Sequence, residues 1–419
     1  MNKLRTFSLE YAGIHATYWM YFGVINSFSS VFLLAKGFSN SEIGVILALG
    51  NIISVAIQPF VADAADKKGG CAVFHMMLGM TGLLAVLTVW LRFSPAHSFL
   101  QAALYTLAIA DTMTIQPFCN AASSTFEQTG IVINFGLCRS AGSLAYALLM
   151  MSLGTLVELK GVNSLAAVGL ITAGLFALVI ARSSHDFARG MAETKSAAAG
   201  KAENGGVQAS VAGAHDEIDL KAFVKRHKMF VIVCIGVMFV YFSNSIINNF
   251  LAQIVLSVGG DSEDTGRIFS LLAFTEIPTL ILFNRINHRF RCTTLLKFSS
   301  IAFIAWIGMC VIAENVLTVY LAQFVQPFAF ALFLPSMVRF IDDTMSRGEA
   351  VKGHTFFTGT TIAASIFTTL AGGFILDASG ARALAITGTA VTTLGALIII
   401  LTIDKAKLET GSEARNLRA

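Results

Sequence analysis

Long apolar stretches separated by short polar segments recur along this chain of 419 residues. Each stretch has about the 20 residues that an α-helix needs to cross the hydrocarbon core of a bilayer. The pattern predicts twelve membrane-spanning helices, at about residues 9–35, 42–64, 73–93, 98–121, 134–158, 162–182, 228–257, 265–286, 293–313, 317–342, 353–377 and 381–403. We therefore expect an all-α integral membrane protein.

One segment breaks this pattern. Residues 183–227 include "AETKSAAAGKAENGGVQASVAGAHDE", which is small, polar and without an apolar period. Such composition is typical of a flexible linker. It divides the chain into a six-helix bundle at 1–182, a cytoplasmic linker at 183–227, a second six-helix bundle at 228–404 and a cytoplasmic tail at 405–419. Repeated halves of this kind are common in secondary transporters, with the solute bound between them.

The composition supports a membrane location. Hydrophobic residues make up 55% of the chain and charged residues 13%, whereas a soluble domain has about 25% charged residues. The net charge of +4 is too small to suggest a nucleic-acid partner. The six cysteines form no CxxC pair and no metal-ligand spacing, so we expect reduced thiols, no metal ion and no cofactor.

Lysine and arginine are concentrated in alternate connecting segments. With the N-terminus inside, the external segments hold only Lys36, Arg92, Lys160, Arg267 and Arg382. Nearly all the other basic residues then fall on the cytoplasmic side, as the positive-inside rule requires. We expect both termini in the cytoplasm of a bacterium and the chain in its cytoplasmic (inner) membrane.

The loop "ADAADKKGG" at 62–70 lies between the second and third predicted spans. Asp66, Lys67 and Gly69 match the acidic residue, basic residue and glycine of the major facilitator superfamily signature, with Ala62 in place of the usual first glycine. The chain thus resembles this superfamily over nearly its whole length. The resemblance implies two pseudo-symmetric six-helix bundles, and it implies a conformational role for this loop.

Other segments resemble the lactose-permease-like branch, the oligosaccharide:proton symporters. They are "GFSNSEIGVILALGNIISVAIQP" (37–59), "QPFCN" (116–120), "NFGLCRSAGSLAYA" (134–147) and "TEIP" (275–278). By this resemblance Arg139 would bind sugar hydroxyls, Tyr146 would stack on the sugar ring, and Glu276 would link sugar binding to proton binding. Relatives in the superfamily also carry nucleosides or aromatic acids, so these substrates stay open.

Arg139 lies inside the fifth predicted span. A charge at the middle of a bilayer costs roughly 2.5–3.5 kcal/mol on insertion scales, so such residues usually serve a function. Ser143 and Tyr146 follow at i+4 and i+7 and share its helical face. Arginine donors suit hydroxyls or a carboxylate. The alternative is an arginine held in a fixed ion pair between helices.

Two carboxyl groups also lie inside predicted spans. Glu276, in "LLAFTEIPTLILF", is the predicted proton carrier, and the alternative is a structural partner of Arg139. Asp111, in "LAIADTMTI", is either a second proton site or a side chain that faces a water-filled cavity without function. Intramembrane carboxyl groups are typical of proton pathways.

Four amide side chains complete the predicted substrate site, and they are Asn120, Asn244, Asn248 and Gln326. Amides inside spans bind polar ligands or join helices. Asn120 and Gln326 stand where the lactose-permease-like branch has charged residues, so most of that branch's proton relay is absent. A facilitator without proton coupling is therefore an alternative. Trp19 is interpreted as a packing or interfacial residue.

The chain lacks the patterns of an enzyme or an ATP-driven pump. It has no HExxH, GxSxG or Walker A sequence, and these are the patterns that carry zinc hydrolysis, serine hydrolysis and nucleotide binding. We predict a monomeric secondary transporter that takes up a sugar or oligosaccharide with a proton by alternating access. The alternatives are a nucleoside or aromatic/organic acid permease, and an exporter of drugs or metabolites.

Overall fold

The computed structural model describes residues 3–68, 70–129, 131, 133, 135–199 and 220–416. Every regular element in these ranges is a helix. In chain order the elements are α1 (Lys3–Phe22), the π-helical η1 (Gly23–Ser27), α2 (Ser29–Ala35), α3 (Asn40–Lys68), α4 (Gly70–Phe93), α5 (Phe99–Glu127), α6 (Phe135–Lys160), α7 (Ser164–Ala199), α8 (Leu220–Arg226), α9 (Lys228–Ser257), α10 (Ser262–Arg289), α11 (Cys292–Val311), α12 (Val316–Ala322), the π-helical η2 (Pro327–Ala331), α13 (Leu332–Thr344) and α14 (Arg347–Asn416).

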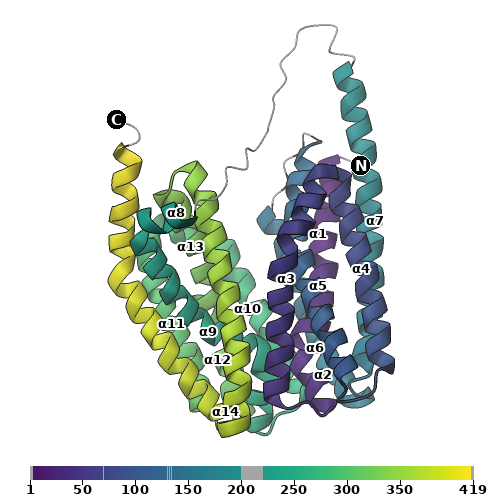
Figure 1. Cartoon of the computed structure of the whole chain (residues 1–419), viewed down its shortest axis with the longest axis vertical. Coiled ribbons are helices and arrows are strands. Elements are labelled where there is room, and N and C mark those ends of the chain that lie inside the picture. The colour runs from purple at the N-terminus through teal and green to yellow at the C-terminus, as the bar shows by residue number, and fades with distance from the viewer. Residues whose placement is uncertain are drawn as a thin grey trace.

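Ten helical stretches of the described chain are long and apolar enough to cross a membrane. One of them, Glu349–Lys407, holds two predicted spans that meet at Gly380, whose φ of +81° suits a glycine at a reversal of the chain. Figure 1 shows α14 as two arms that meet at one end of the bundle. Helix α5 has 29 residues but too many polar side chains to be among the ten. With α5 and the second arm, the predicted twelve-helix membrane fold is confirmed.

Two predicted spans are interrupted helices. The first, at 9–35, consists of α1, η1 and α2, and the tenth, at 317–342, consists of α12, η2 and α13. Pro327 begins η2 and cannot donate a backbone hydrogen bond, which favours a change in the hydrogen-bonding pattern at this point. Short π-helical segments inside longer helices are frequent at functional sites.

The structure differs from the prediction between the two bundles. Helix α7 continues to Ala199 although the predicted linker began at residue 183, and α8 forms from Leu220 to Arg226. Alanine, glutamate and lysine are strong helix formers, and the Arg189–Glu193 pair at 3.9 Å adds a contact along one face of α7. Helix α14 likewise continues through the predicted tail to Asn416. Residues 200–219 lie outside the described ranges, so the linker as a domain boundary stays a prediction.

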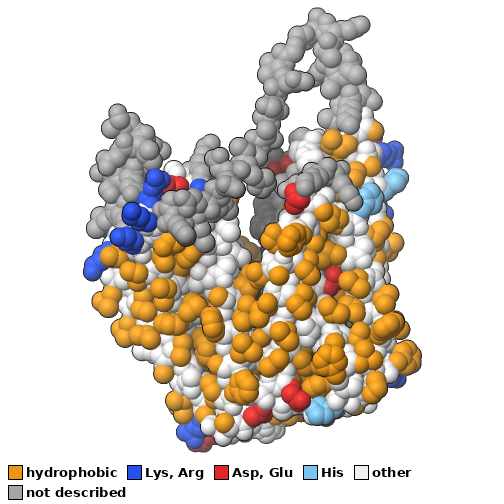
Figure 2. Space-filling model, viewed as in Figure 1, with side chains coloured by type: hydrophobic (Ala, Val, Ile, Leu, Met, Phe, Trp, Pro, Cys, Tyr) orange, Lys and Arg blue, Asp and Glu red, His pale blue; other side chains and the backbone are white. Residues whose placement is uncertain are grey.

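Figure 1 shows α1–α7 on one side of the molecule and α8–α14 on the other. Helix α6 packs against α10, and α3 packs against α14, across the boundary between these halves. The start of α1 and the end of α14 lie at the same end of the bundle, here called the basic end. Figure 2 shows hydrophobic side chains over the middle of the visible face and most of the charged side chains toward its ends, as expected for a membrane-spanning surface.

Hydrogen bonds between described residues of the two halves lie toward the other end, here called the opposite end. The Asp377 carboxylate on α14 accepts hydrogen bonds from the Asn40 backbone N–H at 3.0 Å, the Asn40 amide at 2.9 Å and the Ser41 N–H at 2.7 Å. The Gln253 amide donates to Asn40 Oδ1 at 3.2 Å. These bonds anchor the start of α3 on the second half.

Close backbone approach accompanies these bonds. A Cβ atom on Gly44 would collide with the carbonyl oxygen of Thr369, and one on Gly373 would collide with that of Asn40. Small residues allow membrane helices to approach this closely. The two halves are therefore in direct contact, and the structure is closed, at the opposite end.

We expect Gly373→Val to separate the halves at the opposite end, because the added side chain collides with the α3 backbone. Overpacking costs about 1–3 kcal/mol, enough to shift a two-state equilibrium by roughly 5- to 150-fold. Spin labels at the exposed positions Lys160 and Leu317, measured by double electron–electron resonance, should report a longer distance.

Gly359→Val is the matched control, because Gly359 lies on the same helix with open space around it. An unchanged distance distribution in Gly373→Val, or the same change in both variants, would contradict the proposed closure contact.

Candidate solute-binding site

A cavity of 210 Å³ lies between the two halves. The first half contributes α1 and α6, and the second half contributes α9, α10 and the segment around η2. The lining residues are Trp19, Phe22, Arg139, Ser143, Tyr146, Asn244, Asn248, Leu272, Ala273, Glu276, Gln326 and Phe330. The structure thus brings together six predicted site residues, and they are Arg139, Tyr146, Asn244, Asn248, Glu276 and Gln326. Their roles in binding or coupling stay predictions.

The Arg139 guanidinium is oriented by neighbours in its own half. It lies over the Trp19 ring, 4.2 Å from the centroid, and its Nη1 donates to Ser143 Oγ at 3.3 Å. A cation–π contact contributes about 0.5–2 kcal/mol, more when it is shielded from water. No carboxylate of the described residues lies within 4.0 Å of the guanidinium. In this conformation Arg139 therefore has no ion-pair partner among the described residues.

Glu276 faces the same cavity from the second half. The Gln326 amide donates a hydrogen bond to its Oε1 at 2.6 Å. Glu276 thus has a neutral partner, and Arg139 borders the same space from the other half without contacting it. A solute with both donors and acceptors would fit between Arg139 and Glu276.

Aromatic and amide groups form the rest of the lining. The Tyr146 hydroxyl shares a hydrogen bond of 2.8 Å with Ser27 Oγ, which joins α6 to η1. The Asn248 amide N–H donates to the Asn244 carbonyl at 2.9 Å on the same helix. Phe22 and Phe330 add apolar surface from either half. The cavity therefore combines a few polar groups with aromatic walls, as binding sites for small molecules usually do.

Two of the residues predicted for substrate binding or proton coupling lie outside this lining, and both are on α5. The Asn120 residue is exposed, and its backbone carbonyl accepts a hydrogen bond from the Tyr11 hydroxyl at 3.4 Å. Asp111 is buried, and its Oδ2 has no hydrogen-bond partner among the described residues. A sequence match fixes a residue's height along its helix but not its distance from other helices. Roles for Asn120 and Asp111 stay predictions without support from proximity.

The segment 62–70, expected as the signature loop, is largely helical: α3 continues through Asp66 and Lys67 to Lys68, and α4 begins at Gly70. The side chains of Asp66 and Lys67, and Gly69 as a whole, lie outside the described residues. The conformational role of this loop stays a prediction.

The sequence interpretation missed the aromatic floor beneath Arg139. Trp19 was expected to be a packing residue, but it lines the cavity and contacts the guanidinium. Phe22 lies one turn further along, with its ring centroid 4.8 Å from that of Trp19. The i, i+3 spacing on the first span could have indicated a shared aromatic face. Nothing in the sequence says that this face meets Arg139.

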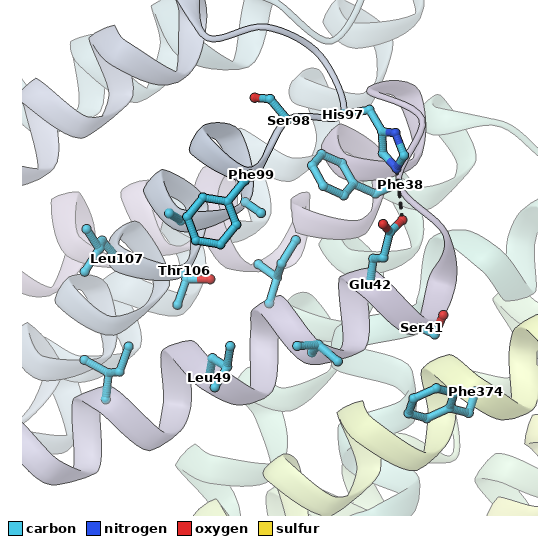
Figure 3. A pocket seen from close by; sticks show the side chains of 15 residues that line it. Phe38, Ser41, Glu42, Leu49, His97, Ser98, Phe99, Thr106, Leu107 and Phe374 are labelled. Carbon is cyan, nitrogen blue, oxygen red and sulfur yellow. Dashed lines mark hydrogen bonds and ion pairs between the residues drawn. The ribbon is translucent and has the colours of Figure 1, made fainter.

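A larger cavity of 790 Å³ lies between α3 and α5 and extends to Phe374 of α14. Figure 3 shows mostly apolar side chains along it, including Leu49 and Phe99, with the Glu42–His97 pair at its rim. In this pair, His97 Nε2 lies 3.2 Å from Glu42 Oε2. Phe99 and Phe374 are exposed, as expected for a groove that faces lipid. Apart from the Glu42–His97 pair at its rim, the described lining of this cavity has no ionisable side chain that could bind a polar solute.

The model of the "MFS_1 like family" matches residues 11–386. The chain belongs to this family and is a multi-pass membrane transporter of the major facilitator type.

Individual proteins similar to this chain are also transporters. The chain is 24% identical over 354 residues to "Uncharacterized transporter YwbF" of Bacillus subtilis (strain 168), covering 81% of this chain and 79% of the relative. The crystal structure of the nucleoside transporter NupG is similar with a TM-score of 0.73 at 16% identity, covering 96% of this chain and 99% of that one. The structure of a point mutant of NupG gives a TM-score of 0.75 at 15% identity, covering 94% and 99%. These structures show the fold alone.

We expect Trp19→Leu to raise the Kd of the transported solute by about 2- to 30-fold, because it removes the cation–π contact that orients Arg139. The measurement is a binding titration on purified protein. Trp90→Leu is the matched control, since Trp90 is exposed on α4. Equal affinities in the two variants would show that the aromatic floor does not position Arg139 for binding.

Proposed function

We propose that this chain takes up a hydroxylated ring solute, with sugars as the first candidates, together with a proton by alternating access. One observation carries the proposal: Arg139 and Glu276 face one cavity from opposite halves without contacting each other. A solute bound between them would contact both halves, and its binding would favour conformations that keep Arg139 and Glu276 close.

The chemistry of the cavity supports a sugar-like solute. Sugar hydroxyls both donate and accept hydrogen bonds, so they can satisfy the Arg139 donors, the Asn248 amide and the Glu276 carboxyl. Aromatic rings such as Tyr146 offer flat apolar faces to a sugar ring. The volume of 210 Å³ is below the ~300–1,000 Å³ of pockets that hold drug-sized ligands. It favours a small solute over a long oligosaccharide.

Glu276 is the proposed proton carrier. A charged carboxyl inside a membrane protein is costly unless water or a partner compensates it, and here its hydrogen-bond partner is the neutral Gln326 amide. Protonated Glu276 could donate to a solute hydroxyl. Departure of the solute would admit water, and water would stabilise the charged form after the proton leaves. Solute release and proton release would then occur on the same side.

A nucleoside is the second candidate. Trp19, Phe22 and Phe330 supply aromatic surface for a base, while the same polar groups could bind the ribose. The structural likeness to a protein named as a nucleoside transporter, at 15–16% identity, bears on the fold alone. Sugars and nucleosides therefore belong in one screen.

The orientation in the membrane is also part of the proposal. Basic side chains such as Arg182, Arg226 and Arg339 lie at the end where α1 begins and α14 finishes. By the positive-inside rule this end faces the cytoplasm of a bacterium. Closure at the opposite end then describes a carrier closed to the outside, with bundles at 1–182 and 228–404 acting as the moving halves of a monomer.

We expect Glu276→Gln to abolish accumulation driven by a pH gradient, acidic outside, while exchange of internal for external solute persists. The amide keeps the shape and hydrogen-bonding capacity of the side chain but cannot carry a proton. A gradient of one pH unit can support up to about tenfold accumulation with one coupled proton. The measurement is uptake of radiolabelled sugars and nucleosides into proteoliposomes.

Glu263→Gln is the control, since Glu263 lies on the same helix and pairs with Arg267 outside the cavity. If the pH gradient changes the accumulation of no transported solute, in the wild type or in Glu276→Gln, the protein is a facilitator.

A further inference from the structure

A second polar cavity, of 360 Å³, lies at the basic end of the second half. It is formed where α10 ends, α11 begins, and α13 and α14 pass alongside. Its described ionisable lining consists of His288, Arg291, Arg339, Lys407 and one carboxylate, Asp343. All of these elements belong to one half, so this cavity is separate from the solute site between the halves.

The positive charge of this cavity exceeds its negative charge. Arg339 Nε lies 3.0 and 3.1 Å from the two oxygens of Asp343, so this one carboxylate is engaged by one arginine. Lys407 and Arg291 add two further cationic side chains to the lining. Arg291 forms no ion pair or side-chain hydrogen bond with any described residue. Among the described residues of the lining, basic side chains therefore outnumber carboxylates.

Backbone groups add to this charge. Arg291 is the N-cap of α11, a helix of 20 residues, and provides no side-chain cap. Its carbonyl accepts hydrogen bonds from the N–H groups of Thr294 and Leu295 at 3.0 and 3.1 Å. The earlier N–H groups, at Cys292 and Thr293, have no acceptor one turn back in the helix, and both residues line the cavity. A helix start of this kind favours a negatively charged group.

We propose that this cavity binds a phosphate group carried by an anionic phospholipid or by a soluble phosphate ester. Guanidinium groups match the geometry of phosphate oxygens, and basic pockets between membrane helices on the cytoplasmic side bind anionic headgroups. Figure 2 shows Lys and Arg side chains gathered at the basic end of this half, just beyond the hydrophobic belt.

The position of the cavity favours the lipid source. Phe290 lies at its rim and is 51% exposed, so an apolar surface adjoins the cationic one. A phospholipid has the same arrangement, with a phosphate next to acyl chains. A soluble phosphate ester would use the cationic lining alone.

The test is a binding titration of delipidated, full-length protein by native mass spectrometry, with dioleoyl phosphatidylglycerol and dioleoyl phosphatidylcholine as probes. We expect phosphatidylglycerol to bind more tightly. Arg291→Gln should weaken its binding about fivefold, and the double variant Arg291→Gln/Lys407→Gln should weaken it about 25-fold, since each cation near an anionic lipid contributes about 1 kcal/mol.

Arg289→Gln is the matched control. Arg289 is an exposed arginine two positions away that does not line the cavity, so its replacement should change binding less than twofold. Arg291→Lys keeps the charge and should retain most of the affinity. Thermal unfolding of each variant shows whether it is folded, and a misfolded Arg291→Gln would be replaced by Lys407→Gln in the comparison.

Glycerol 3-phosphate and inorganic phosphate distinguish the two sources. Displacement of phosphatidylglycerol by millimolar amounts of either compound assigns the site to soluble phosphates, and no displacement assigns it to lipid. The proposal is overturned if Arg291→Gln and Arg289→Gln bind phosphatidylglycerol equally, or if phosphatidylcholine binds as tightly. Because the readout is binding at another cavity, its outcome is independent of the solute and proton proposed above.

Discussion

Arg139 carries a charge within a membrane-spanning helix, and the centre of the molecule is organised around this constraint. A bare charge in lipid is costly, so the arginine must face polar groups, aromatic faces or water. Trp19 and Ser143 of its own half meet the guanidinium. The second half supplies a carboxyl group across the cavity instead of a direct ion pair. The cavity between Arg139 and Glu276 is thus an essential part of the site, because it separates the two side chains.

The contacts at the opposite end complement this open centre. Asp377 binds the start of α3 through charge-assisted hydrogen bonds, and glycines such as Gly44 let the backbones touch. Short side chains and backbone atoms form these contacts, so the contacting groups have few alternative conformations. The contacts can break and re-form as units, which suits two rigid halves that move relative to each other.

Much of the fold could be predicted from the sequence, because a bilayer imposes a length and a composition on each span. The span at 98–121 was recognisable from its apolar stretch, although the polar side chains of α5 lower its hydropathy. The extension of α7 to Ala199 was missed, since polar residues that form helices outside lipid leave no apolar period. For the site, intramembrane polarity singled out the side chains that line the cavity. It could not separate them from Asp111, which is buried elsewhere, and it could not show that Trp19 meets Arg139, because that contact joins two helices.

The π-helical segments η1 and η2 have a further consequence. Each lies in an interrupted span, and residues next to or within them, such as Phe22 and Phe330, border the cavity. A π turn contains an extra residue compared with an α turn. The helical faces before and after the π-helical segment are therefore rotated relative to each other, and one helical wheel cannot describe the whole span. The outer part of the first span can follow its partner at the opposite end, where Ser30 donates to the Asn249 carbonyl. The inner part can keep its aromatic rings against the solute. In the proposed mechanism, closure at the opposite end and contact with the solute would then fall to separate parts of one span.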